Sequence, residues 1–292
     1  MLKRIITSIV AICVLIPILI FDETWVLPAA VSICSVIGIL EMLNCIGLRK
    51  NWFLTIPLCL AALFFPIFVR YSYLSRADHI SSLRDLIKLS LGIIFIMALY
   101  VFGVAVFGNK TVSITDAGLL FASSLYIIAA FSSIIYIHDY VAYGNHIYLL
   151  TFICAWVTDI FAYFTGRFFG KHKLIPAVSP KKTVEGAIGG VVFCVISTVL
   201  FGFIIEKFFN EYGITSANYL MLAISGVFIS VVSQTGDLIM SVIKRHYGIK
   251  DYGKLFPGHG GILDRFDSVL AVALILAFIC TYFNLLTIGV AY

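Results

Sequence analysis

The residues best suited to chemistry lie in one charged stretch near the C-terminal end of the chain. It holds a basic pair, Lys244 and Arg245, and two aspartates, Asp264 and Asp267, on either side of a Pro-Gly-His-Gly-Gly turn. The aspartates are three residues apart, so on a helix they share one face. Carboxylate oxygens suit Mg²⁺, and Lys and Arg hold phosphates. The stretch therefore predicts a site for a divalent cation and phosphate groups.

Asp237 adds a third carboxylate from an apolar segment just before this stretch. It is followed at helical spacing by Ser241, Lys244 and Arg245, which places all four on one helix face. An ionisable residue inside an apolar segment favours a functional role. A metal ligand beside phosphate-binding cations is one interpretation. A structural ion pair between Asp237 and Lys244 is the alternative, and the residues alone do not exclude it.

The glycine-rich turn fits an anion site. Gly260 and Gly261 allow the backbone to approach a ligand closely, and successive N–H groups before a helix favour anions. A simple tight turn, which Pro257 and Gly258 alone would explain, is the alternative. For His259 three roles stay open: a hydrogen bond to phosphate, an acid, or a cap of the turn.

A second basic stretch repeats the pattern. Lys181 and Lys182 follow Ser179, and Thr183 with Glu185 has the composition of a helix start. Basic residues beside a helix N-terminus suit a phosphate or a phospholipid headgroup. An ordinary membrane-flanking anchor is the alternative, and it is the interpretation favoured for the neighbouring lysines at positions 171 and 173.

Other polar and small residues lie inside predicted helices. Asp159 precedes Arg167 by two turns, and its simplest role is an ion pair or hydrogen bond with that residue. Glu41 suits either a helix–helix hydrogen bond or a catalytic role. Gly186 and Gly190 form a GxxxG pair, which predicts close helix packing.

These residues must be positioned by membrane helices. The hydrophobic fraction is 61% and the charged fraction 12%, against about a quarter charged in soluble domains. A spanning helix needs about 20 mostly apolar residues. Nine segments qualify: about 5–21, 25–48, 52–69, 89–107, 118–137, 147–168, 184–208, 218–242 and 266–290. We therefore predict an all-α integral membrane protein, a polytopic helix bundle with a single domain over 1–292. The third span is the weakest, because Pro57 and Pro66 lie in it.

The distribution of Lys and Arg predicts the orientation. With nine spans and a cytoplasmic N-terminus, cytoplasmic segments hold 15 of the 20 basic residues, as the positive-inside rule requires. The C-terminus is then outside, and the loops at about 167–183 and 244–265 face the cytoplasm. The net charge of +5 reflects this topology and anionic lipid, with no nucleic-acid partner expected. Residues 71–88 are either an amphipathic helix on the outer surface or a plain connector.

The stretch from Ser241 to Asp267 resembles the signature of the phosphatidate cytidylyltransferases, or CDP-diacylglycerol synthases. That pattern reads S-x-apolar-K-R, four residues, K-D, then P-x-H-G-G-apolar-x-D-R-apolar-D, and no position departs from it. The segment that begins at Asp159 is similar to a second region of the family. The resemblance covers about 156–268, the expected catalytic region.

The resemblance implies an enzyme that joins CTP and phosphatidate, with magnesium, to give CDP-diacylglycerol and pyrophosphate. A second metal ion and a homodimer are left open, and a bacterial inner or plasma membrane is the expected location. The expected metal ligands are Asp237 and Asp264, with Asp267 as a third. The expected catalytic residues are Asp237, Asp264, Lys244, Arg245 and His259. The expected substrate-binding residues are Ser179, Lys181, Lys182, Lys250, Gly260, Gly261 and Arg265.

Two other functions remain to be distinguished. A CTP-dependent lipid kinase would use similar substrates but transfer the terminal phosphate. An ion-coupled transporter would line an ion path with Asp237, Asp159 and Glu41. Transporters often contain two related halves, and no internal repeat is apparent in the sequence. Acyl-chain preference and selectivity between CTP and dCTP are not encoded in any recognisable pattern.

Overall fold

The computed structural model describes residues 13–75, 79–108, 112–208, 215–258 and 260–288. Within these ranges seven helices are long and apolar enough to cross a membrane. The chain is therefore an all-α polytopic membrane protein with two short strand pairs. It divides into two compact units, Met1–Tyr140 with His246–Phe266, and Val141–Arg245 with Asp267–Tyr292. The single domain over 1–292 stays a prediction, and each unit is described separately.

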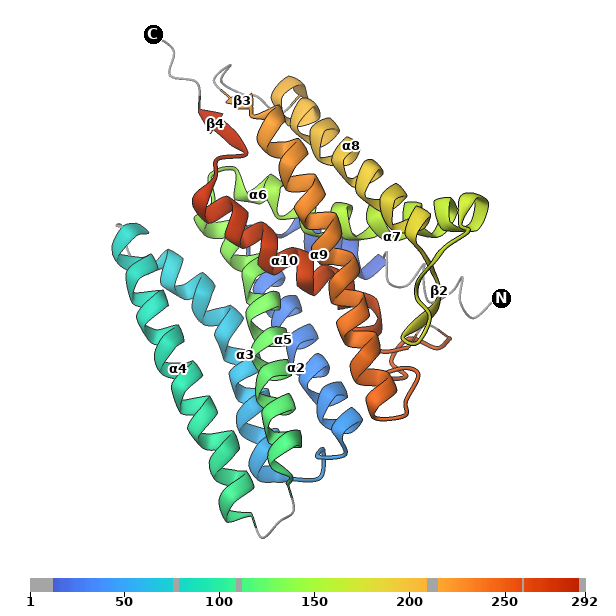
Figure 1. Ribbon diagram of the computed structural model, residues 1–292. Coiled ribbons are helices and arrows are strands. Elements are labelled where there is room, and N and C mark those ends of the chain that lie inside the picture. The colour runs from blue at the N-terminus through green and yellow to red at the C-terminus, as the bar shows by residue number, and fades with distance from the viewer. Residues whose placement is uncertain (1–12, 76–78, 109–111, 209–214, 259, 289–292) are drawn as a thin grey trace. The chain divides into compact units, whose positions relative to one another are not determined.

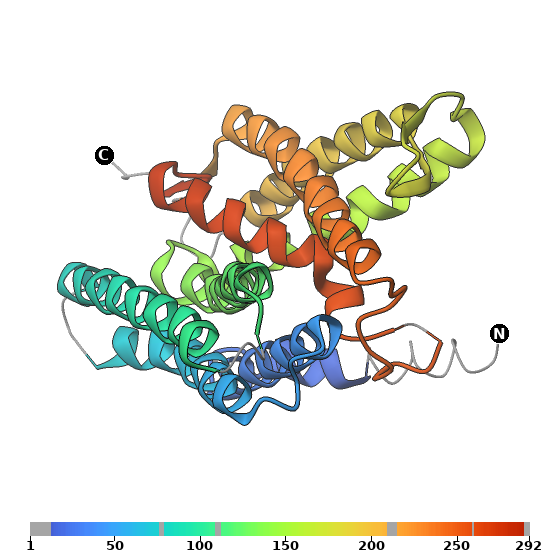
Figure 2. The ribbon, with the colours of Figure 1, turned by 60° about the horizontal axis from the view of Figure 1, so that its bottom comes forward.

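The first unit is built on four long helices that pack side by side (Figures 1 and 2). They are α2 (Val26–Ile46), α3 (Trp52–Leu74), α4 (His79–Phe107) and α5 (Ile114–Tyr140). Helix α2 ends at Gly47, whose φ of 83° lets its N–H bond back to the carbonyls of Asn44 and Leu43. Fully buried Met42, Leu58 and Ile127 belong to the core of this bundle.

The second unit is built on α7, α8 and α9. In chain order its elements are α6 (Gly144–Ile147), α7 (Leu149–Phe169), β1 (Lys173–Ile175), β2 (Ser179–Thr183), α8 (Val184–Phe208), β3 (Thr215–Ala217) and α9 (Tyr219–His246). Helix α10 (Leu263–Tyr282) begins in the first unit and continues into the second, where β4 (Leu286–Ile288) follows it. Strands β1 and β2 form an antiparallel hairpin between α7 and α8, and β3 pairs antiparallel with β4.

The predicted close packing at the GxxxG pair is confirmed. A side chain at Gly190 would meet the carbonyl oxygen of Thr158 on α7 at 3.0 Å, and Gly186 lies against Gly166 in the same way. Nearby, the rings of Phe161 and Phe193 stack with their centroids 3.7 Å apart. Helix α9 joins this pair because Thr198 of α8 donates a hydrogen bond to the carbonyl of Leu222 at 2.9 Å. Glycines at the contact therefore let α7 and α8 approach almost backbone to backbone.

The helices agree with the second to eighth expected spans, and α3 is continuous despite Pro57 and Pro66. Most of the first span lies outside the described residues. The ninth was placed too far toward the C-terminus, since α10 ends at Tyr282 and residues 286–288 pair with β3 as a strand. The separate amphipathic helix that was one alternative for residues 71–88 is also not found among the described residues. Helix α3 continues to Leu74 and α4 starts at His79, because buried residues such as Leu86 extend the apolar face of α4.

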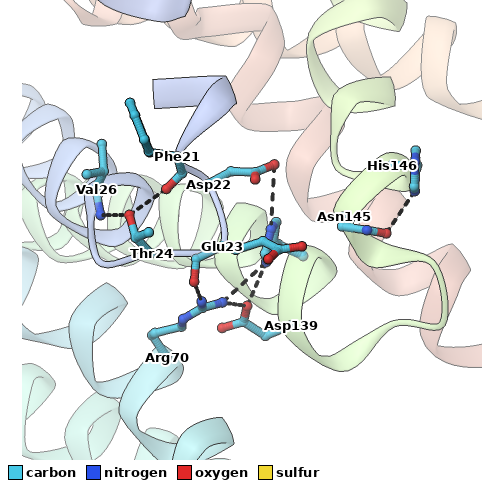
Figure 3. Close-up of polar contacts among 10 residues, drawn as sticks. Phe21, Asp22, Glu23, Thr24, Val26, Arg70, Asp139, Asn145 and His146 are labelled. Carbon is cyan, nitrogen blue, oxygen red and sulfur yellow. Dashed lines mark hydrogen bonds and ion pairs between the residues drawn. The ribbon is translucent and has the colours of Figure 1, made fainter. Parts of the chain in front are cut away.

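Arg70 lies one residue beyond the third expected span, 52–69, and it is buried near the end of α3. Its guanidinium contacts the carboxylate of Asp139 and the backbone carbonyl of Glu23 (Figure 3). The ring of His138 also lies against Asp139, with Nδ1 2.7 Å from Oδ1. A buried charge without a partner is strongly destabilising. The ion pair between Arg70 and Asp139 therefore allows Arg70 to be buried. At Arg70 three segments of the first unit meet: α3, α5 and the chain before α2.

Candidate active site

The second unit contains a charged cavity of about 300 Å³ at the start of α8. Side chains from α7, β2, α8 and α9 line it. The charged ones among them are Asp159, Arg167, Lys181, Lys182 and Asp237. Three cations and two carboxylates in one small cavity form a set that can bind phosphate groups and a cation together.

The hairpin and the first turn of α8 place the two lysines at this cavity. Thr183 caps α8, because its Oγ1 accepts a hydrogen bond from the N–H of Gly186 at 3.1 Å. Glu185 in the first turn accepts the N–H of His172 at 3.2 Å and so ties the hairpin to the helix. The predicted helix start is thus confirmed. Lys181 and Lys182 lie on β2 immediately before this positive helix end, where anions are favoured.

Asp237 forms its ion pair with Lys182 and thereby joins the two basic stretches of the sequence. Lys182 Nζ lies 2.5 Å from Asp237 Oδ2, and each side chain is about a quarter exposed, at 27% and 24%. Ser241, one turn along α9, donates a longer bond of 3.4 Å to Asp237 Oδ1. The ion pair that the structure gives Asp237 is thus with Lys182, and the alternative pair with Lys244 stays a prediction. Lys244 is buried, and it interacts electrostatically with Asp267.

Asp159 has a different partner from the one expected. Its Oδ2 accepts a hydrogen bond from Ser268 of α10 at 3.0 Å, while Arg167 donates to the hydroxyl of Tyr163 at 3.2 Å. The expected pair of Asp159 with Arg167 is not formed within the described residues. Asp159 and Asp267 each interact electrostatically with Asp237. The second unit therefore gathers three carboxylates, and Asp159 is the member that sequence reasoning did not assign to the site.

In the first unit, Asp264 organises the glycine-rich stretch. Its Oδ2 accepts the N–H of Tyr252 at 2.8 Å and the N–H of Gly261 at 2.9 Å. Phe256 and Gly260 exchange two backbone hydrogen bonds, of 2.9 and 3.1 Å, which closes the turn between them. Gly260 has a φ of 90°, and a side chain there would also collide with Asp264. Glycine is required at this position by the fold of the loop itself.

Glu41 forms a hydrogen bond between two helices, α2 and α10, which was one of its two expected roles. Its carboxylate accepts the N–H of Ile262 at 2.9 Å and the N–H of Leu263 at 2.8 Å. The side chain is buried, with 8% of the residue exposed. Glu41 therefore bonds to the backbone at the start of α10. The signal in the sequence was an acidic residue within an apolar helix, but the sequence does not reveal its partner.

The other expected residues divide between the units. Arg245, Lys250 and Arg265 are exposed, and Ser179 begins β2. His259 lies outside the described residues. Asp237 and Asp267 belong to the second unit and Asp264 to the first, so the metal pair of Asp237 and Asp264 stays a prediction. Within the described residues, no three Asp, Glu, His or Cys side chains lie close enough to hold one metal ion.

Comparison with known proteins assigns the chain to a family. A sequence model described as the cytidylyltransferase family matches residues 2–283. A phosphatidate cytidylyltransferase of Staphylococcus haemolyticus is 34% identical over 271 residues, which are 92% of this chain and 95% of the relative. The phosphatidate cytidylyltransferase of Bacillus subtilis is 32% identical over 287 residues, 97% of this chain and 99% of the relative. The chain belongs to the cytidylyltransferase family.

Proposed function

We propose that this protein is a phosphatidate cytidylyltransferase, which converts CTP and phosphatidate to CDP-diacylglycerol and pyrophosphate. Family membership and the names of the relatives support a nucleotidyltransferase of this kind. The observation that carries the proposal is the cavity where Lys181, Lys182 and Arg167 meet Asp159 and Asp237. It lies among membrane-spanning helices, where a charged cavity would serve a substrate that is both lipid and phosphate.

The reaction needs charge compensation more than proton transfer. A phosphate oxygen of phosphatidate forms a bond to the α-phosphorus of CTP, and the bond from that phosphorus to the oxygen bridging to the β-phosphate breaks. Pyrophosphate leaves with the electron pair. The attacking oxygen is already anionic, so no strong general base is required. Lys181, Lys182 and Arg167 suit the remaining tasks, which are to bring two polyanions together and to stabilise the charge on the leaving group.

We propose magnesium as the cofactor, held by Asp237 and Asp264 with Asp267 as a third ligand. The chemistry of these residues supports the proposal, because Mg²⁺ prefers carboxylate oxygens and substrate phosphates. Asp159, which interacts electrostatically with Asp237, is a fourth carboxylate available to one or two ions. Bound magnesium would neutralise phosphate charge. Lys182 is the cation beside Asp237, so a magnesium ion held by this carboxylate would compete with Lys182.

We further propose the topology that the basic residues indicate. Nine spans, a cytoplasmic N-terminus and an outer C-terminus place both basic loops on the cytoplasmic side of a bacterial plasma membrane. The support is the position of 15 of the 20 Lys and Arg residues and the seven helices that can span a membrane. The proposed orientation also gives the site access to CTP from the cytoplasm.

The choice of lipid acceptor tests this function against its rivals. Purified protein is incubated with CTP and magnesium, and with either phosphatidate or diacylglycerol in mixed micelles. We expect CDP-diacylglycerol and pyrophosphate with phosphatidate, and no reaction with diacylglycerol. A CTP-dependent lipid kinase would instead convert diacylglycerol to phosphatidate and release CDP. An ion-coupled transporter would form no covalent product from either lipid.

A further inference from the structure

The loop that leads into α10 is folded around one buried carboxylate. Glu41 reaches it from α2, and its two carboxylate oxygens accept the N–H groups of Ile262 and Leu263 at 2.9 and 2.8 Å. Glu41 and Ile262 are 221 residues apart in sequence. Both belong to the first unit, so the contact lies within one compact body.

Glu41 takes the place of a helix cap. The first N–H groups of a helix have no partner within the helix, and a negative charge near them is favoured by the helix dipole. A cap usually comes from a polar side chain just before the helix. The residues before Leu263 are Gly260, Gly261 and Ile262, none of which has a polar side chain. The carboxylate of Glu41 supplies the missing acceptors from another helix.

Two glycines of the loop pack directly against this carboxylate. At Gly261 the three atoms nearest to an added Cβ all belong to Glu41, and at Gly253 the nearest two do. All of these distances are too short for a real contact. Neither glycine has a positive φ, so alanine is sterically excluded by Glu41 and not by the backbone. The group that the backbone of Gly261 approaches closely in the structure is the carboxylate of Glu41.

The Glu41 carboxylate works beside that of Asp264. Asp264 accepts the N–H of Gly261, and Glu41 accepts the next two N–H groups in the chain. Two carboxylates thus divide three successive backbone donors between them. Glu41 fixes the start of the helix on which Asp264 stands, one turn before Asp267.

We propose that Glu41 is a positioning residue, which holds Gly253 and residues 260–263 in the conformation that presents Asp264 to the reaction. The catalytic part of this inference rests on the proposed function, whereas the structural part does not. Glu41 itself touches no substrate in this account. Its removal should lower the maximal rate, because a displacement of about 1 Å at a reacting group costs about 10²-fold in rate. Since Asp264 is a proposed magnesium ligand, the removal of Glu41 should weaken magnesium binding only where the loop itself is loosened.

The first test uses Glu41→Ala and Glu41→Gln, with hydrogen exchange and kinetics on each. We expect the amides of Ile262 and Leu263 to lose protection, while amides within α2 to α5 keep theirs. The value of kcat should fall about 10²-fold in Glu41→Ala. It should fall less in Glu41→Gln, which keeps one carbonyl acceptor. Any weakening of magnesium binding should appear only in a variant that also loses amide protection at Ile262 and Leu263. Glu206→Gln is the matched control, because Glu206 also accepts a backbone N–H, that of Ala217 at 3.1 Å, but belongs to the β3 region.

The second test exploits the steric contact. Gly261→Ala should lower activity in the presence of Glu41, since the new methyl group collides with the carboxylate. In the double variant Glu41→Ala/Gly261→Ala the collision is gone. We expect the double variant to be no worse than Glu41→Ala alone, whereas two unrelated roles would multiply their losses.

Unchanged amide hydrogen exchange at Ile262 and Leu263 in Glu41→Ala would overturn the proposal. A loss of magnesium affinity in Glu41→Gln without a change in exchange would overturn it as well, because it would make Glu41 a ligand. If the wild-type protein shows no cytidylyl transfer at all, the proposed function fails, but the exchange result still decides whether Glu41 holds the loop.

Discussion

Replacement of Asp237 by Asn distinguishes a reacting site from a surface ion pair. The Asp237–Lys182 pair has good geometry, at 2.5 Å, but each side chain is about a quarter exposed. Exposed pairs contribute about 0.2–1 kcal/mol to stability, so we expect Asp237→Asn to cost about 1 kcal/mol. For a domain of this size that lowers the melting temperature by about 2–4 °C. The folded protein should therefore remain abundant.

The expected loss of activity is much larger. Removal of one preorganised electrostatic group from an active site costs about 10²–10³-fold in kcat, or about 2.7–4 kcal/mol of transition-state stabilisation. An ion pair with no catalytic role cannot supply an effect of that size. The comparison of about 1 kcal/mol in stability with about 3 kcal/mol in activation free energy thus decides between the two interpretations of Asp237.

The assay is specific activity per folded protein across a magnesium titration, for Asp237→Asn, Lys182→Met and the double variant. We expect the double variant to be little worse than either single variant, because parts of one catalytic unit are not additive. Lys173→Met is the matched control, since it removes a charge from the same hairpin at an exposed residue that does not line the cavity. A normal maximal rate and an unchanged magnesium dependence in Asp237→Asn would refute the reasoning.

Three further predictions concern stability, packing and topology. Arg70→Met should lower the free energy of unfolding by about 3–5 kcal/mol, because it leaves the buried carboxylate of Asp139 without its charge partner. Thermal unfolding in detergent measures this loss, and the double variant Arg70→Met/Asp139→Asn should recover part of it. Gly190→Leu should reduce the yield of folded protein, because its side chain has no room beside Thr158; a wild-type melting temperature would contradict the close packing of α7 and α8. Cysteines placed at Lys181 and at Lys254, in a background without the native cysteines, should react with impermeant thiol reagents only after the cytoplasmic side is opened, so labelling in intact cells would disprove the orientation.

Features encoded locally were predictable from the sequence. The seventh expected span, 184–208, coincides with α8, because an uninterrupted apolar run specifies a membrane helix by its composition alone. The start of that helix was also predictable, since Thr183 and Glu185 have the chemistry of a helix N-terminus. The glycines at 186 and 190 indicated a close contact, although not that α7 was the partner.

Pairings between distant residues were not predictable in the same way. Glu41 bonds to Ile262, Asp237 pairs with Lys182, and Arg70 is buried against Asp139. In each case the sequence shows a charged residue in or beside an apolar segment, which signals that a partner must exist. The identity of the partner depends on which helices are neighbours. The third expected span ends just before Arg70 because the apolar run ends there, whereas the pair with Asp139 lets the helix continue to Leu74.

The fate of the individual CTP phosphates tests the central claim most directly. Two parallel reactions contain purified protein, phosphatidate and magnesium, with CTP labelled either at the α-phosphate or at the γ-phosphate. The account predicts that the α label enters the lipid as CDP-diacylglycerol and that the γ label is recovered as pyrophosphate. Recovery of the γ label in the lipid, with the α label in free CDP, would contradict it.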